Sequence, residues 1–395
     1  MADKAESRAP QRDAGDATVS NRRLKLHTDY GHAAMWLKGF SAHEMSAAYA
    51  RATEFAGPGD DAVSRFVAYY ADCLRDFVRG ENRQARATAE TFLREAEAGG
   101  RATEAGVARR VLGIVLLHLG DLQASRNVLE SALDEYVQER DRETMHRFGN
   151  DTQVSATNYL ALTEWHLGEL KRTRHLIDHA TRRAAELGHV PAVASALYFK
   201  TVIECRRGDL PATLLGAESL LALTEEHNMK TYADLSQIYA NWARGRLFDP
   251  EAGAVGLRRA LESYLFEGNK SGSPSFHAML AELEAMQSDF DSALALIDQG
   301  LAIANETGEH YTDSYLYRLR GETLQRYDPA NPTSAEEAFE AALTIAKRQR
   351  ARSLELLASL ALAKLYQSSA PANRRQEDAV AGGSLDLRVS VARLA

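Results

Sequence analysis

Apolar side chains recur at every third or fourth position through most of this 395-residue chain, with polar residues between them. That spacing places the apolar residues on one face of an α-helix, so each such stretch is predicted to be an amphipathic helix. Ala, Leu, Glu and Arg are abundant, and all four favour helix. The sequence contains no convincing strand-rich region. The pattern therefore predicts an all-α protein.

One kind of turn separates pairs of these helices at nearly constant intervals. It consists of a glycine, or a residue in its place, followed in most copies by an acidic residue. The copies are Gly39-Phe40, Gly80-Glu81, Gly120-Asp121, Gly168-Glu169, Gly208-Asp209, Phe248-Asp249, Ser288-Asp289 and Tyr327-Asp328. Successive copies lie 41, 40, 48, 40, 40, 40 and 39 residues apart. The one long interval contains the charged stretch 138–150, which indicates a loop insertion.

The repeating unit is a helix–turn–helix, because each copy of the turn lies between two amphipathic stretches. Such units stack side by side and bury their apolar faces against their neighbours. We expect a right-handed α-solenoid of about eight repeats, with a period of ~40 residues, over 22–368. Residues 1–21 lack periodicity and are predicted to be a disordered N-terminal lead-in. Residues 369–395 are predicted to form an irregular or truncated tail.

The composition argues against several classes of function. Apolar residues make up 45% of the chain and charged residues 26%, with a net charge of −8. This acidic balance argues against nucleic-acid binding. No run approaches the roughly 18 apolar residues that cross a bilayer, so no membrane association is expected. Cys73 and Cys205 form no disulfide or metal pattern, and a cytoplasmic location is predicted.

Small or apolar residues occupy the positions that a tetratricopeptide repeat (TPR) reserves for close helix contact, when the turn glycine is placed at position fifteen. In the third repeat these are Leu112, Gly113 and Ala132, and in the seventh they are Leu280, Ala281, Ala293 and Gly300. The chain therefore resembles tetratricopeptide repeats. Its period of ~40 rather than 34 residues is similar to the longer MalT-like branch.

Several segments resemble, more specifically, the C-terminal array of large bacterial signalling proteins. These segments are 186–191, 197–200, 306–310, 318–322 and 351–356. Proteins of that family carry a class III adenylate/guanylate cyclase domain, then a P-loop ATPase module, then helical repeats. Similar arrays also follow ATPase modules in LuxR-type regulators. The resemblance implies a regulatory or sensor arm in bacterial signal transduction.

The catalytic parts of that family are absent from this sequence. A P-loop needs G-x-x-x-x-G-K-[ST], and no Gly-Lys pair occurs. A cyclase domain would need carboxylates on a sheet. We therefore expect no enzymatic activity, no cofactor and no bound metal. The pair His175 and His179 lacks a third ligand, and the polar loop 268–273 is better explained as an inter-repeat turn than as a phosphate site.

A groove along the concave face is the candidate binding site. In a TPR superhelix the first helix of each repeat lines that face. Arginine and aromatic side chains dominate the residues expected there, and both types suit an acidic peptide or another anionic ligand. The residues are Arg110, His118, Asn158, Trp165, His166, Tyr198, Arg206, Trp242, Arg246, Glu282, Tyr315, Arg318, Glu322 and Arg326.

Two functions follow from this interpretation. The first is a non-catalytic scaffold that binds a protein or peptide, with a cyclase or a P-loop ATPase acting in trans as a further candidate partner. The alternative is a small-molecule sensor, by analogy with MalT-like arrays. The unpatterned start and the tail also fit a non-functional fragment of a multidomain adenylate cyclase.

Overall fold

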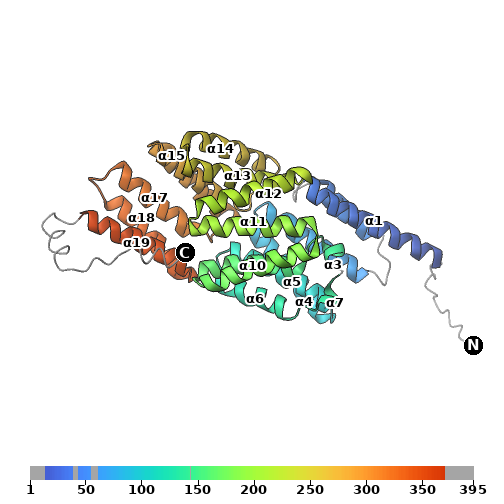
Figure 1. Cartoon of the computed structure of the whole chain (residues 1–395). Coiled ribbons are helices and arrows are strands. Elements are labelled where there is room, and N and C mark those ends of the chain that lie inside the picture. The colour runs from blue at the N-terminus through green and yellow to red at the C-terminus, as the bar shows by residue number, and fades with distance from the viewer. Residues whose placement is uncertain (1–13, 39–42, 55–60, 143, 370–395) are drawn as a thin grey trace, which may run out of the picture.

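The computed structural model describes residues 14–38, 43–54, 61–142 and 144–369, and these residues form nineteen helices and no strand. Figure 1 shows them stacked as a curved array of helical pairs. The helices are α1 (Ala14–Lys38), α2 (His43–Glu54), α3 (Asp61–Val78), α4 (Asn82–Ala98), α5 (Ala102–His118), α6 (Leu122–Asp134), α7 (Gln138–Asp141), α8 (Thr144–Phe148), α9 (Thr152–Leu167), α10 (Leu170–Leu187), α11 (Val190–Arg207), α12 (Leu210–Glu226), α13 (Lys230–Leu247), α14 (Pro250–Phe266), α15 (Ser273–Met286), α16 (Phe290–Thr307), α17 (Asp313–Tyr327), α18 (Thr333–Gln349) and α19 (Arg352–Ser369).

The predicted all-α solenoid of helix–turn–helix repeats is confirmed. Helices pair in chain order, as in α5 with α6 and α13 with α14, and each pair packs on the next. We refer to the first member of each pair as the A helix and the second as the B helix. None of the described helices combines the length and hydropathy that a bilayer crossing requires.

The glycine–acid signature of the turns has a direct structural cause. Gly120, at φ +81°, takes the left-handed conformation that ends the A helix, which glycine adopts without steric cost. Asp121 then caps the B helix, because its side chain accepts a hydrogen bond from the Ala124 N–H at 3.3 Å. Asp209, Asp249 and Asp289 cap later B helices in the same way. In the seventh repeat Ser288, at φ +65°, takes the place of the glycine.

The structure differs from the sequence-based expectation in two segments, the insertion 138–150 and residues 14–21. The insertion 138–150 is not a plain loop, because it contains the short helices α7 and α8. Phe148 anchors it, fully buried and edge-on against Tyr70 with ring centroids 5.4 Å apart. Helix α1 begins at Ala14, so residues 14–21 are helical rather than part of a disordered lead-in. The turn at Gly39-Phe40 and residues 1–13 and 370–395 lie outside the described residues.

Successive turns of the superhelix touch one another, and this is the feature that shapes the interior. The Lys270 N–H donates to the Val78 carbonyl at 2.7 Å, at the end of α3. The His310 N–H donates to the His118 carbonyl at 2.8 Å, at the end of α5. One repeat later, Ser353 Oγ donates to the Trp165 carbonyl, near the end of α9. The concave face is consequently folded around a narrow axis rather than left as an open groove.

Candidate functional site

A cavity of about 150 Å³ lies on this axis. The A helices α3, α5, α9, α11, α13 and α15 supply its walls, and the loop between α14 and α15 crosses it. That loop is the polar segment 268–273, whose backbone is fastened to Val78 on the neighbouring turn. Residues from both turns of the superhelix therefore line one shared cavity.

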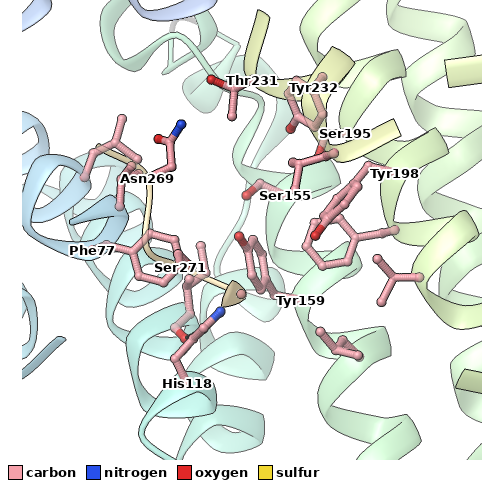
Figure 2. A pocket seen from close by; sticks show the side chains of 18 of the residues that line it. Phe77, His118, Ser155, Tyr159, Ser195, Tyr198, Thr231, Tyr232, Asn269 and Ser271 are labelled. Carbon is pink, nitrogen blue, oxygen red and sulfur yellow. Dashed lines mark hydrogen bonds between the residues drawn. The ribbon is translucent and has the colours of Figure 1, made fainter. Parts of the chain in front are cut away.

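Polar groups surround the empty part of the cavity. Figure 2 shows Asn269 and Thr231 at one end, with the hydroxyls of Ser155 and Tyr159 turned toward the same space. Asn269 is fully buried, yet neither its amide oxygen nor its amide nitrogen bonds to any described atom. The buried Thr231 hydroxyl also has no described partner. Since buried polar groups are normally hydrogen-bonded, these atoms have hydrogen-bonding capacity left for water or a ligand in the cavity.

Arg110 lines the same cavity from α5 and is 2% exposed. Its Nε and Nη2 atoms have no hydrogen-bond partner among the described residues. The guanidinium lies over the Tyr70 ring at 5.4 Å from its centroid. A cation–π contact of this kind compensates only part of the cost of burying a charge.

Aromatic rings form much of the remaining wall. Tyr159 and Phe199 meet edge-on at 4.5 Å between centroids, and Phe77 meets His118 at 4.7 Å. Burial lowers the pKa of His118 to about 4, so its imidazole is neutral at pH 7. The wall combines flat apolar surface with a few fixed polar groups, which is the usual composition of a small-molecule site.

The fourteen sequence-predicted residues separate into distinct groups. Arg110, His118 and Tyr198 line the cavity. Asn158, Trp165 and His166 are buried beside it, and Asn158 Nδ2 donates to Ser195 Oγ at 3.2 Å.

Most of the others form a network around Glu282. One of its carboxylate oxygens accepts from Trp242 Nε1 at 3.0 Å and from Arg246 Nη1 at 2.5 Å, while the other accepts from the Tyr315 hydroxyl at 2.7 Å. Arg206 and Arg318 both lie over the Tyr315 ring, and Arg318 pairs with Glu322.

The remaining predicted arginine has a different position. Arg326 lies over the Phe290 ring at 5.3 Å from its centroid, near the turn edge of the repeats. The predicted groove residues are therefore not one continuous surface.

Sequence reasoning did not select Asn269, Thr231, Ser155 or Tyr159. Asn269 lies in the glycine-flanked loop that the sequence does single out, but its burial depends on the docking of that loop onto α3. Ser155 and Tyr159 are four residues apart on the inner face of α9, and this helical spacing was the available signal.

The cysteines and histidines considered as catalytic or metal-binding residues are not arranged for those roles in the described part of the chain. Burial raises the pKa of the Cys73 thiol and raises that of Cys205 to about 12, so neither is an activated thiolate. His175 is exposed on α10. Among the described residues no group of three His, Cys, Asp or Glu side chains is placed to hold a metal ion.

Comparison with known proteins finds solved structures that are similar to this chain but shows no family. No protein-family model matches the chain. An uncharacterized protein of Rhizobium meliloti (strain 1021) is 21% identical over 238 residues, which is 60% of this chain and 23% of that protein. This chain therefore matches about a quarter of the length of that curated relative.

Solved structures with similar architecture include a Rap protein complexed with competence and sporulation factor. Its TM-score is 0.49 at 10% identity, covering 90% of this chain and 98% of that one. A signal transduction ATPase with a TPR sensor from Pyrococcus horikoshii gives 0.42 at 12% identity, covering 82% and 53%. The described part of this chain is a TPR-like array of helical repeats, as its own helix pairing shows.

Proposed function

We propose that this chain is a non-catalytic ligand-sensing module whose small-molecule ligand occupies the axial cavity. The observation that carries the proposal is the set of buried polar atoms without partners, contributed to one cavity by both turns of the superhelix. A ligand that satisfied Asn269, Thr231 and Arg110 would remove the cost of leaving these groups unpaired. This geometry favours the sensor over an extended peptide groove, because contacts between the two turns of the superhelix divide the concave face.

A ligand at this position would couple binding to the shape of the array. Asn269 belongs to the loop before the seventh repeat, whereas Arg110 belongs to the third, and the two turns are held together by few backbone hydrogen bonds. A molecule that contacts both residues stabilises the closed superhelix relative to any opened form. By linkage, a partner that distinguishes the two forms would respond to the ligand.

The test is a thermal-shift screen of neutral and charged small molecules against the full chain and a Ser155→Phe variant. The phenyl ring should fill the cavity at Ser155, while Ser219→Phe adds the same ring on the exposed face of α12. Genuine cavity ligands should raise the Tm of wild type and of Ser219→Phe but not of Ser155→Phe. A hundredfold excess over Kd corresponds to about 2.7 kcal/mol of stabilisation. Hits that survive in Ser155→Phe, with unchanged circular dichroism, would contradict the proposal.

A protein- or peptide-binding scaffold is the second candidate function. It is supported by the cluster around Glu282, where the Arg246 side chain is 35% exposed beside Trp242 and pairs with Glu282. Tryptophan and arginine together often form the energetic centre of interfaces. Capture from lysate by wild type but not by an Arg246→Ala, Arg318→Ala double variant would favour this function. Arg244→Ala, which removes an exposed arginine paired with Glu218, is the matched control.

The signalling context extends the proposal to partners. The sequence resemblance suggests that the module regulates a cyclase or a P-loop ATPase, in cis or in trans. The Rhizobium meliloti relative leaves most of its length outside the match, as expected if such an array is joined to further domains. The test is to measure ATP hydrolysis by a purified P-loop ATPase module of this signalling class, with and without the array. Equal rates, with and without a cavity ligand, would contradict this extension.

A further inference from the structure

We infer that the cavity is specific for a small organic carboxylate whose anionic group lies against Arg110. This inference rests on the proposed function, because it assigns the chemistry of the ligand in the same cavity. Three features carry it: the buried and unpaired guanidinium, the neutral polar groups at the other positions, and the size of the space.

Arg110 supplies the charge argument. Arginine stays protonated in proteins, so a guanidinium that is 2% exposed retains its charge inside the fold. Neighbouring arginines of the interior have partners: Arg206 donates to Ser275 and Arg246 to Glu282. The guanidinium of Arg110 lies over the Tyr70 ring, and two of its nitrogens, Nε and Nη2, have no acceptor among the described residues. A carboxylate is the group that a guanidinium fork binds through two charge-assisted hydrogen bonds.

The other lining groups limit the ligand to a single negative charge. No described carboxylate or lysine lines the cavity beside Arg110, and His118 is neutral. The amide of Asn269 and the hydroxyl of Thr231 each offer both a donor and an acceptor, which suits an uncharged polar substituent. A space of about 150 Å³ is comparable to an engineered cavity that holds benzene. An aromatic ring bearing one carboxylate matches both size and charge.

The first experiment uses the empty protein. If Arg110 binds a ligand anion, its buried charge is not compensated in the unliganded protein and destabilises the fold. Arg110→Met should therefore raise Tm by about 2 °C or more. Arg126→Met is the matched control, since Arg126 pairs with the buried Glu164 and its loss should lower Tm. A lower Tm for Arg110→Met would show that the guanidinium is structural and would overturn the inference.

The second experiment uses benzoate and the isosteric benzamide as probes, with binding measured by calorimetry. Benzoate should bind wild type at least about tenfold more tightly than benzamide, and Arg110→Met should abolish that difference. Arg110→Lys should keep part of it. Equal affinities for the two probes in wild type, or no binding of benzoate, would overturn the inference. Cavity binding of neutral compounds, lost in Ser155→Phe, would then leave the proposed function standing while the anion assignment fails.

Discussion

The hydroxyl of Ser353 donates to the carbonyl oxygen of Trp165 at 2.6 Å, although 188 residues separate the two in sequence. The contact joins the start of α19 to the end of α9, and both residues are buried. Equivalent contacts join the ends of α3 and α5 to the loops that precede α15 and α17. The superhelix is therefore stabilised along its axis as well as between neighbouring repeats, unlike an array in which each unit contacts only its neighbours.

Ser353→Ala should lower the free energy of unfolding by about 1 kcal/mol, because it removes one buried hydrogen bond across the closure. The carbonyl of Trp165 keeps a second partner, the Gly168 N–H at 3.1 Å, so the loss should not be larger. Ser219→Ala is the control, since the Ser219 hydroxyl bonds only within an exposed part of α12. Urea unfolding measures both. Equal midpoints for the two variants would mean that the closure contributes little stability.

Stability should fall between pH 6.5 and pH 8 because of Glu309. This fully buried carboxyl accepts the Gly272 N–H, at 2.9 Å and 3.1 Å to its two oxygens, and burial raises its pKa from 4.5 to about 8. The folded state then holds a proton that the unfolded state has released, so stability declines with pH across that window, by at most about 1.4 kcal/mol per unit. The lowered pKa of His118, about 4, has the opposite effect: it makes the protein less stable as the pH falls, but only below pH 6.5.

Glu309→Gln separates this effect from other titrations. The glutamine keeps an acceptor for the Gly272 N–H but does not ionise. The variant should therefore show a nearly constant urea midpoint from pH 6.5 to pH 8, and it should be the more stable protein at pH 8. Parallel pH profiles for wild type and variant would show that Glu309 is not the titrating group.

Gly253→Ala should destabilise the array by at least about 1–3 kcal/mol, because α13 and α14 cross there with their backbones in contact. A Cβ atom at Gly253 would lie 2.4 Å from the Cα of Gly245 and 2.8 Å from the carbonyl oxygen of Asn241. Neither atom belongs to a flexible side chain. A Cβ atom at Gly106, inside α5, would meet no atom within 4 Å beyond its chain neighbours and the backbone of its own helix, so Gly106→Ala should instead stabilise by about 0.5–1 kcal/mol. Thermal unfolding of both variants tests this, since Tm should fall for Gly253→Ala and rise for Gly106→Ala.

The helices were predictable because their information is local. The apolar period, the turn glycines and the capping aspartates each act within a few residues, so the repeat boundaries follow from the sequence. Helices α7 and α8 were not predictable, since elements of four and five residues are too short to show a helical period. Helix α8 packs through Phe148 against Tyr70, which is a long-range contact.

The cavity was predictable only in part, for a similar reason. Helical register places Arg110, His118 and Tyr198 on the inner face, but the pitch of the superhelix decides what lies opposite them. The pitch depends on contacts between distant residues, such as Lys270 with Val78. Contacts of this kind produce no periodic pattern in the sequence. Asn269 therefore becomes a cavity residue only once the two turns meet.

Arg350→Gly should stabilise the protein by about 0.5–1 kcal/mol. Arg350 follows α18 with φ +57°, which is the left-handed conformation. This conformation costs a residue other than glycine roughly 1–2 kcal/mol. Glycine avoids that cost, although it loses more backbone entropy on folding. The side chain is exposed, so little packing is lost. Arg348→Gly, two residues earlier and inside the last turn of α18, should be destabilising by up to about 1 kcal/mol. Urea midpoints that move in the same direction for both variants would contradict the assignment of strain to Arg350.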